Sequence, residues 1–373
     1  MNASSPEPLL QFHTPFQLIP SSRHEVVLYG GEAYCFNVRS TEFDVVRLCE
    51  NLNAGISAAD LFALVSGSTA AQQLMDEMRD AQLVRNVQVP DGLEPELLER
   101  WSPQVEALRC RENSRSSRFD MMKRLRGSHV LAIGVGSLGS WAIQHLVAAG
   151  VGKVTLVDFD VVSASNLTRQ CFFREKDVGR PKLEAAREVI ETLSRYTRVE
   201  TRHLCVDSAE CARTLIDSTK PVDLVVLTAD EPMWKIAPWL AQAALRTNVP
   251  LLRGNSRGIG PLLLDAESAC PACDWPRICA TVPHAAEVID YYRSAGVARR
   301  RAGRGAVSTQ VAIAGALLGS EALAFLAGVD APISLNTLIR VSDGALPQVH
   351  TEPFPKSADC PICGPTPNLN GLG

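Results

Sequence analysis

Four cysteines form two matched pairs near the C-terminal end of the chain. Two residues separate Cys270 from Cys273, and two residues separate Cys360 from Cys363. This Cys-x-x-Cys spacing is typical of proteins that hold a tetrahedral Zn²⁺ through four thiolates. Four sulfur ligands leave no open coordination position for a substrate. The spacing therefore predicts a structural zinc site that ties two distant segments of the chain together.

The other cysteines are not marked for chemistry. Cys279 lies just beyond the first pair and could accept an acyl group as a thioester. Its flanking charges do not single it out as an activated nucleophile, which favours an incidental or structural thiol. The chain has 11 cysteines and no basic, apolar N-terminal segment of the secretory kind. Reduced thiols and a cytoplasmic location are therefore expected.

A glycine-rich segment predicts a second kind of site. Gly134, Gly136 and Gly139 follow a short apolar run, with Ser137 between the last two glycines. Glycines at this spacing let backbone N–H groups approach a phosphate at the start of a helix, where the helix dipole favours an anion. Asp158 then ends the next apolar run and suits the hydroxyl groups of a ribose. By itself the glycine pattern is most typical of a dinucleotide-binding dehydrogenase, although Asp158 would suit the ribose of ATP as well.

Alternating strands and helices position these residues. Apolar runs at residues 129–133 and 153–157 enclose a helical segment at 141–149, which is the order of a βαβ unit. Further helices are expected at residues 183–196 and 234–247, and further strands at 222–228 and 250–252. The sequence therefore predicts an α/β fold with a Rossmann-like nucleotide-binding sheet.

Polar residues beyond the second strand distinguish between the two nucleotides. Asn166, Arg169 and Gln170 stand close together, and Lys182 and Asp230 follow. Attack of a carboxylate on the α-phosphorus of ATP builds negative charge on the phosphate oxygens. Arginine, lysine and Mg²⁺ stabilise that charge. A nicotinamide dehydrogenase gives no reason for these residues, so the set favours ATP chemistry.

The segment from about Arg115 to Cys363 resembles the ThiF/MoeB family of E1-like adenylating enzymes, and most of all its peptide-maturation members of the microcin-C and pantocin type. The resemblance rests on Asp158-Phe-Asp160, Asn166-Leu-Thr-Arg-Gln170 and Lys182, together with Asp230. It implies a homodimer that uses ATP and Mg²⁺. The implied roles are the ATP ribose for Asp158, the phosphates for Asn166, Arg169 and Gln170, the α-phosphate region for Lys182, Mg²⁺ for Asp230, and entry into the other protomer's ATP site for Arg118.

Three residues depart from the family pattern. Ser137 stands where glycine is usual, Glu231 stands where asparagine usually follows the metal-binding aspartate, and Lys235 stands where arginine is common. A serine still offers its backbone N–H to a phosphate, but its side chain narrows the approach. The departures affect the details of the site more than the class of reaction.

The first ninety residues predict a separate small domain. Strands are expected at Glu25–Tyr29 and at residues 33–38, joined by a turn at Gly30 and Gly31, with a last strand at Leu83 and Val84. Helices are expected from Ser40 or Thr41 to Leu52, after Ser57, and at residues 70–81. This order resembles the PqqD-like, winged-helix-like domain that binds the leader of a ribosomally made precursor peptide.

Three segments are therefore predicted. They are a leader-recognition domain at residues 1–90, a linker and dimer arm at 91–125, and an adenylation domain with the four-cysteine zinc site at 126–373.

Charge and hydropathy exclude two classes of partner. The net charge of −4 gives no general attraction to nucleic acid or to an anionic membrane. The most apolar stretch, residues 311–329, contains Ser320 and Glu321, which favours a buried helix over a membrane span. The dense run Arg299-Arg-Arg301 with Arg304 is either a solvated surface or a contact for an acidic peptide or for pyrophosphate.

The expected function is ATP-dependent adenylation of a carboxylate on a ribosomally made precursor peptide, in the biosynthesis of a peptide antibiotic. The carboxylate is either the peptide's C-terminus or a glutamate side chain, and the arginine run mildly favours an acidic core. Activation of a ubiquitin-like sulfur-carrier protein is one alternative. A peptide-binding scaffold without catalysis is another, although the retained charged residues argue against it.

Overall fold

The computed structural model describes residues 9–12, 16–30, 35–87, 92–113, 115–294, 305–329, 331–342 and 347–364. The chain divides into two compact units, Met1–Lys123 and Arg124–Gly373. Gly31, Ala33 and the Arg299–Arg304 run lie outside the described residues.

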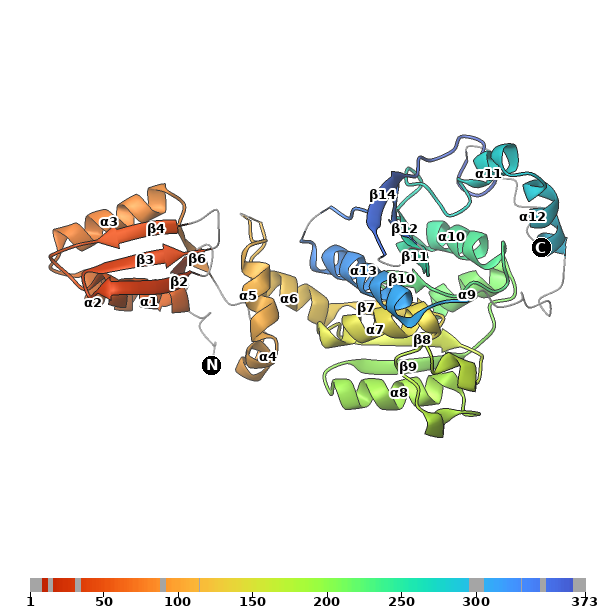
Figure 1. The fold of residues 1–373 in the computed structure, drawn as a ribbon, viewed down its shortest axis with the longest axis horizontal. Coiled ribbons are helices and arrows are strands. Elements are labelled where there is room, and N and C mark those ends of the chain that lie inside the picture. Colours follow the sequence, from red (N-terminus) through yellow and green to blue (C-terminus); the bar gives the residue numbers. More distant parts are fainter. Residues whose placement is uncertain are drawn as a thin grey trace. The chain divides into compact units, whose positions relative to one another are not determined.

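The first unit begins with two small sheets and the helices α1, α2 and α3 (Figure 1). One sheet has the order β2-β3-β4 and the other has the order β5-β1-β6. The predicted strands Glu25–Tyr29 and 33–38 correspond to β3 and to β4, which begins at Cys35. The bounds are β1 Leu9–Phe12, β2 Gln17–Ser22, β3 Glu25–Tyr29, β4 Cys35–Arg39, β5 Ile56–Ser57, β6 Val84–Val87, α1 Val45–Ala54, α2 Ala58–Val65 and α3 Thr69–Asp80.

The expectation of three strands in this unit was wrong, because the described residues form six. β1 is only four residues long, β5 only two, and β2 contains Pro20 and a mostly exposed surface. None of them carries the alternation of apolar and polar residues that identifies a strand from sequence. Distant partners form β1 and β5, as with Leu10 of β1 opposite Asn86 of β6, and β2 pairs with the neighbouring β3.

Capping residues explain where the helices of this unit begin. Ser57 accepts a hydrogen bond from the backbone N–H of Asp60 at 3.0 Å and caps α2, as the sequence predicts. The cap of α1 is Asp44, which accepts from the N–H of Arg47 at 3.0 Å, and not Ser40 or Thr41. The helix therefore starts one turn later than predicted.

The segment predicted as a linker packs within the first unit. It forms α4 (Pro95–Arg100), α5 (Ser102–Arg109) and the start of α6 (Arg118–Gly127). The side chain of Arg109 is fully buried, and its Nε donates to the carbonyl oxygen of Phe12 at 2.9 Å. Residues 92–123 thus belong to the same compact unit as β1, while the role of residues 91–125 as a dimer arm stays a prediction.

An eight-stranded sheet forms the centre of the second unit. Its order is β14-β13-β12-β11-β10-β7-β8-β9, and the five strands from β11 to β9 are parallel. β12, β13 and β14 extend it as antiparallel strands. The bounds are β7 His129–Ile133, β8 Lys153–Asp158, β9 Arg198–His203, β10 Leu224–Leu227, β11 Leu251–Asn255, β12 Gly258–Leu263, β13 Thr337–Val341 and β14 Val349–Pro353.

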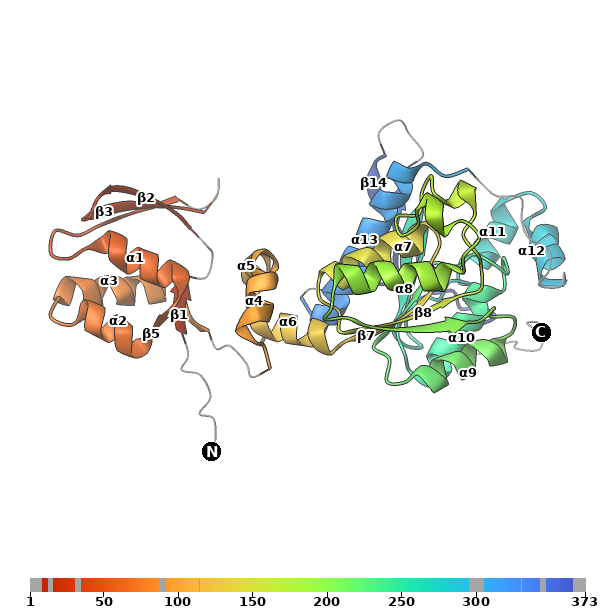
Figure 2. The ribbon, with the colours of Figure 1, turned by 90° about the horizontal axis from the view of Figure 1, so that it is seen from below.

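Helices cover both faces of this sheet, so the predicted α/β fold is confirmed (Figure 2). α7, α8 and α13 lie on one face, and α9 and α10 lie on the other. α11 and α12 follow β12 along the chain. The bounds are α7 Ser137–Ala148, α8 Lys182–Leu193, α9 Ala209–Thr219, α10 Ile236–Thr247, α11 Trp275–Thr281, α12 Ala285–Ser294 and α13 Ser308–Ala327, with short 3₁₀ turns η1 Ala164–Asn166 and η2 Glu175–Asp177.

α13 is long and apolar enough to cross a membrane, but it packs against α7 in the second unit. A Cβ atom on Gly315 would lie 2.4 Å from the Cβ of Trp141, so only glycine allows this close approach. The buried carboxylate of Glu321 accepts hydrogen bonds from the N–H and the hydroxyl of Ser334 at 2.8 and 2.7 Å. The helix therefore contributes to the protein core, as its composition predicts.

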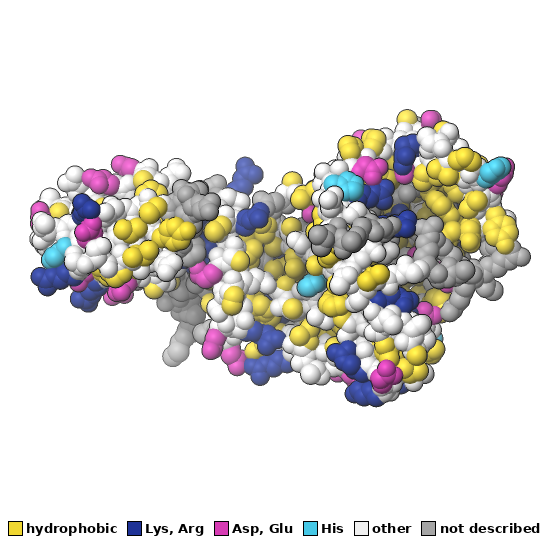
Figure 3. Space-filling model, in the orientation of Figure 1, with side chains coloured by type: hydrophobic (Ala, Val, Ile, Leu, Met, Phe, Trp, Pro, Cys, Tyr) yellow, Lys and Arg dark blue, Asp and Glu magenta, His cyan; other side chains and the backbone are white. Residues whose placement is uncertain are grey.

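Exposed apolar side chains gather over α11 and α12 (Figure 3). Val282, Val288 and Tyr291 expose about half of their surface, with fractions of 50%, 44% and 51%. A group of exposed apolar side chains of this kind marks a surface that can bind a partner.

Candidate active site and metal centre

The glycine loop between β7 and α7 has the shape that a phosphate requires. Gly134 has a φ of +98°, and a Cβ there would lie 2.6 Å from the backbone nitrogen of Ala229. A Cβ on Gly139 would lie 2.0 Å from the carbonyl oxygen of Gly134. Gly136 has no atom within 4 Å of its Cβ position and faces open space. Two glycines are thus needed by the fold, and the third leaves room for a ligand at the N-terminus of α7, which begins at Ser137.

Asp158 joins the end of β8 to this loop. One carboxylate oxygen accepts from the N–H of Val135 at 2.8 Å. The other accepts from the N–H groups of Phe159 and Asp160 at 2.8 and 2.9 Å. A carboxylate offers about four acceptor positions, so one remains for a ribose hydroxyl. The predicted ribose contact is compatible with this geometry and stays a prediction.

The end of β10 is tied to the same loop. The hydroxyl of Thr228 donates to the carbonyl oxygen of Gly134 at 2.8 Å. Asp230 follows two residues later and its side chain is exposed. The glycine loop therefore lies with Asp158 and Asp230 at the carboxyl edge of the parallel strands, where α/β sheets bind their ligands.

Lys182 reaches this edge from the start of α8. Its side chain is buried, with 6% exposed, and its Nζ lies 3.0 Å from Oδ2 of Asp160. The backbone N–H of Lys182 also donates to the carbonyl oxygen of Asp160 at 3.0 Å. The second aspartate of Asp158-Phe-Asp160 thus positions the lysine, which is a role that the sequence did not reveal.

Asn166, Arg169 and Gln170 lie on the loop that begins with η1. Asn166 is buried and accepts from the N–H of Ser163 at 3.1 Å, so it shapes the turn. The guanidinium of Arg169 donates to the carbonyl oxygen of Ser165 at 2.6 Å. Gln170 is only 5% exposed, and its Oε1 has no hydrogen-bond partner in the described part of the chain. A buried oxygen of this kind is usually completed by an ordered water or by a ligand.

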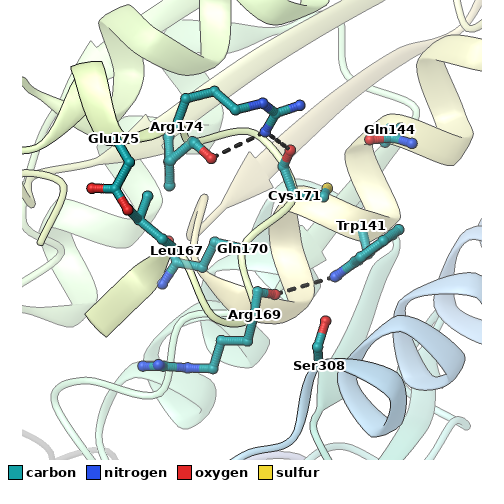
Figure 4. Close-up of a pocket in the computed structure, with 10 residues that line it drawn as sticks. Trp141, Gln144, Leu167, Arg169, Gln170, Cys171, Arg174, Glu175 and Ser308 are labelled. Atoms are coloured by element: carbon teal, nitrogen blue, oxygen red, sulfur yellow. Dashed lines mark hydrogen bonds between the residues drawn. The ribbon is translucent and has the colours of Figure 1, made fainter. Parts of the chain in front are cut away.

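A cavity of about 580 Å³ lies beside this loop (Figure 4). Trp141 of α7 donates from its indole N–H to the carbonyl oxygen of Arg169 at 3.2 Å, while the Arg169 guanidinium extends away from the indole. Ser140, one residue earlier, accepts from the N–H of Cys171 at 3.2 Å. α7 therefore supports the phosphate loop at one end and the Arg169 loop along its side. The lining residues are Trp141, Gln144, Leu167, Arg169, Gln170, Cys171, Phe173, Arg174, Glu175 and Ser308.

The four predicted zinc ligands come together in the core of the second unit. The sulfur atoms of Cys270, Cys273, Cys360 and Cys363 all lie within 4.8 Å of one another. The Cys270–Cys360 and Cys273–Cys363 sulfur pairs are 3.5 and 3.3 Å apart. Four sulfurs at about 2.3 Å from a tetrahedral Zn²⁺ would be separated by roughly 3.8 Å. The cluster therefore fits a zinc ion.

The four thiols of the cluster form hydrogen bonds with one another. These bonds lower the pKa of Cys360 and Cys273 and raise the pKa of Cys270 and Cys363. A Cβ on Gly364 would lie 2.5 Å from the carbonyl oxygen of Cys360, so the tight turn after the second pair needs glycine. Cys279, in contrast, lies exposed on α11 and is not a member of the cluster.

Arg118 lies in the first unit, at the start of α6. It is 3% exposed, and its backbone N–H and guanidinium both contact Glu112, at 2.7 and 3.3 Å. The guanidinium also donates to Gln11. Burial lowers the pKa of Arg118. Its predicted entry into the ATP site of another protomer would require release from Glu112, and it stays a prediction.

The structure thus brings together Gly134, Gly136, Ser137, Gly139, Asp158, Lys182 and Asp230 at one edge of the sheet, with the Asn166–Gln170 loop supported by α7. The four clustered cysteines form a centre that is separate from this edge. Sequence reasoning missed Thr228 and Trp141, because a single hydroxyl or indole carries no spacing signal. Lys235, noted as a departure, is buried with its ammonium 5.8 Å from the ring centroid of Trp239.

Comparison with known proteins agrees with this geometry. The ThiF family model matches residues 111–362. The sulfur carrier protein ThiS adenylyltransferase of Escherichia coli is 28% identical over 250 residues, which cover 66% of this chain and 90% of the relative. Molybdopterin-synthase adenylyltransferase of Escherichia coli is 36% identical over 136 residues, which cover 36% of this chain and about half, 52%, of the relative.

Solved structures share the fold over nearly the whole chain. Escherichia coli MccB, solved with ATP, covers 95% of this chain with all of its own length, at a TM-score of 0.67 and 18% identity. PaaA covers 91% of this chain with 98% of its own length, at a TM-score of 0.67 and 18% identity. At these identities the likeness concerns the fold.

The fold and the site define an E1-like adenylating enzyme. The chain belongs to the ThiF family, as its motifs predicted, and the chemistry of this class is ATP-dependent adenylation.

Proposed function

We propose that this enzyme adenylates a carboxylate of a ribosomally made precursor peptide, in the biosynthesis of a peptide antibiotic. The active form would be a cytoplasmic homodimer that uses ATP with Mg²⁺ and holds a structural Zn²⁺. The carboxylate is the C-terminus of the peptide or a glutamate side chain. Neither nucleic acid nor membrane takes part.

The observation that carries the proposal is the compact unit that precedes the ThiF domain. The ThiS adenylyltransferase matches about two thirds of this chain, whereas the MccB fold covers 95% of it. A solved complex pairs MccB, a microcin C7 biosynthetic enzyme, with N-formylated MccA. An added small domain is useful for holding a peptide, and simple carrier activation does without one.

The site residues have roles that suit the reaction. The peptide carboxylate attacks the α-phosphorus of ATP, the bond to the bridging oxygen breaks, and pyrophosphate leaves. The N–H groups at the start of α7 and the side chains of Arg169 and Lys182 would face the phosphate oxygens, where charge grows during the attack. Asp230 is exposed beside the glycine loop and would bind Mg²⁺ through its carboxylate. Asp158 would orient the ribose.

The leader would bind at an edge of the β2-β3-β4 sheet. β4 is an edge strand, and three of its five residues are exposed. An extended peptide can add a strand there and satisfy free backbone groups. Leu74 of α3 is half-buried and could contact such a peptide, whereas Met78 is 3% exposed and belongs to the core.

The test is a pyrophosphate-release assay with the full chain, Mg²⁺ and ATP. The peptide substrate would be a synthetic copy of one encoded by a short reading frame beside the gene. We expect release of pyrophosphate that depends on the peptide, and we expect the isolated unit Met1–Lys123 to bind the peptide's leader in fluorescence anisotropy. ATP binding without any peptide-dependent release would contradict the proposal.

Sulfur-carrier activation is the second candidate, because the ThiS and molybdopterin-synthase adenylyltransferases are relatives in sequence. The same assay separates the two. Release driven by a ThiS-type carrier and not by any peptide would favour this candidate. Failure of Met1–Lys123 to bind a leader would point the same way.

A further inference from the structure

Arg253 occupies an unexpected place beside the predicted metal-binding aspartate. It lies on β11, and its partner on the neighbouring parallel strand β10 is Leu227, three residues before Asp230. Parallel strands present their carboxyl ends at the same edge of the sheet. The second half of β11 therefore borders the edge that carries the glycine loop and Asp230.

The side chain of Arg253 is turned towards the α10 face of the sheet. Gly254, the next residue, faces the opposite layer, because a Cβ there would lie 2.9 Å from both Leu138 of α7 and Leu318 of α13. Successive side chains of a strand point to opposite faces. The pairing of β11 with β12 is also irregular between Leu252 and Gly254. Such irregularities re-aim side chains and are frequent beside active sites.

The guanidinium of Arg253 has no direct contact with an opposite charge in the described residues. The half-buried guanidinium makes no hydrogen bond or ion pair within the described parts of the chain. Burial lowers its pKa, the positive charge of Arg340 lowers it further, and the negative charge of Asp230 raises it. Arg340 itself is paired with Glu352 at 2.8 Å. A guanidinium in this position can bind an anion that enters the site.

A buried donor without an acceptor follows Asp230 along the chain. The indole N–H of Trp234 is buried and has no acceptor among the residues that the structure describes. Its ring packs edge-on against Trp275 at 6.0 Å, and its φ is +64°. Left-handed backbone at a bulky residue is strained and is often held in place at functional sites. The Trp234 indole and the Arg253 guanidinium are both donors, so a ligand that binds either of them is an acceptor.

We propose that Arg253 forms a subsite for a carboxylate of the peptide, next to Asp230 at the carboxyl edge of the sheet. A guanidinium binds a carboxylate through two parallel hydrogen bonds, which fixes its orientation as well as its position. This subsite rests on the proposed function. Its ligand is either the carboxylate that is activated or an acidic side chain beside it.

The experiment measures peptide binding by calorimetry on the full chain saturated with Mg²⁺ and the ATP analogue AMPCPP. Three synthetic hexapeptides serve as probes: a neutral peptide with a C-terminal amide, the same peptide with a free C-terminal carboxylate, and the amide peptide with two glutamates. We expect the wild-type chain to bind one acidic probe about tenfold or more tightly than the neutral one. Arg253→Gln should abolish this preference.

Two variants serve as comparisons. Arg246→Gln should keep the preference, because Arg246 is exposed in the last turn of α10, at the opposite edge of the sheet. Arg253→Lys should keep part of it, since lysine retains the charge and loses the paired hydrogen bonds. A preference for the free C-terminus assigns the subsite to the terminal carboxylate, and a preference for the glutamate peptide assigns it to a side chain.

The proposal is overturned if the wild-type chain shows no preference for an acidic probe, or if Arg253→Gln retains that preference. Arg253→Gln should also leave Tm unchanged or raise it, because the arginine has no partner to lose. A fall of several degrees would instead assign Arg253 to the structure of the fold. Failure of AMPCPP itself to bind would count against the proposed function and not against the subsite.

Discussion

The cysteine centre and the nucleotide edge lie in the same compact unit, and spaced motifs predicted both of them. They differ in whether the chain itself supplies a partner for every ligand group. Cys270, Cys273, Cys360 and Cys363 enclose one position with four equivalent sulfur atoms. At the nucleotide edge, the oxygen of Gln170 and the guanidinium of Arg253 have no partner in the described residues. One centre is a closed set of ligands and the other is an incomplete one.

This difference separates structural from functional sites. A structural metal contributes its binding free energy to folding, so its ligands are all supplied by the chain. A binding site contains polar groups that have no partner within the protein, because their partners arrive with the substrate. Substitutions in the cysteine centre should therefore mainly lower stability, and substitutions at the nucleotide edge should mainly weaken binding or turnover.

The largest expected effect is on turnover. Asp230→Ala should lower peptide-dependent pyrophosphate release by about 10³-fold or more, because its carboxylate would hold the Mg²⁺ that neutralises phosphate charge. Asp230 is exposed, so Tm should change little. Asp217→Ala on the surface of α9 is the control and should keep full activity. Turnover close to wild type in Asp230→Ala would remove this residue from the catalytic set.

Loss of a cysteine ligand should act on stability. Cys363→Ser should release the zinc and destabilise the second unit by about 4 kcal/mol or more, since the metal joins residues after β12 to the C-terminal segment. Metal analysis after dialysis and thermal unfolding measure the two effects. Cys279→Ser, outside the cluster, should retain about one zinc per chain. Freshly purified, reduced wild-type protein without zinc would contradict the assignment.

Two glycines of the same loop provide a matched pair. Gly139→Ala should destabilise the protein by about 2 kcal/mol, because the new methyl group meets the carbonyl oxygen of Gly134 at 2.0 Å. Gly136→Ala should leave stability nearly unchanged, because its Cβ position is open, and should weaken ATP binding. Thermal unfolding and calorimetry with AMPCPP separate the two. Equal ATP affinity in wild type and Gly136→Ala would show that the ligand does not approach this glycine.

The smallest expected effect has opposite signs for stability and binding. Gln170→Met removes a buried oxygen without a donor and should raise the free energy of unfolding by about 1 kcal/mol. It should also weaken AMPCPP binding, if the nucleotide supplies the missing donor directly or through water. Gln144→Met, in the same cavity, should leave AMPCPP affinity unchanged. A loss of stability in Gln170→Met would mean that this side chain supports the fold.

Local patterns were the reliable part of sequence analysis. The β7–loop–α7 unit, the cap at Ser57 and the two cysteine pairs all depend on residues a few positions apart, and the structure contains each of them. The cap of α1 was missed because Ser40, Thr41 and Asp44 are all good caps by residue type. In the structure the cap is Asp44, whose carboxylate accepts from the N–H of Arg47.

The sequence by itself determined the class of this protein, because glycine, cysteine and charged residues at given spacings leave few chemical alternatives. The tertiary structure decided which charged residues have a partner within the chain. Asp160 is bound to Lys182, Arg118 is bound to Glu112, and Arg253 has no partner in the described residues although it carries the same charge as Arg118. The reason is physical: burial and the pairing of charges depend on contacts between strands and helices far apart in the chain, which no local spacing encodes.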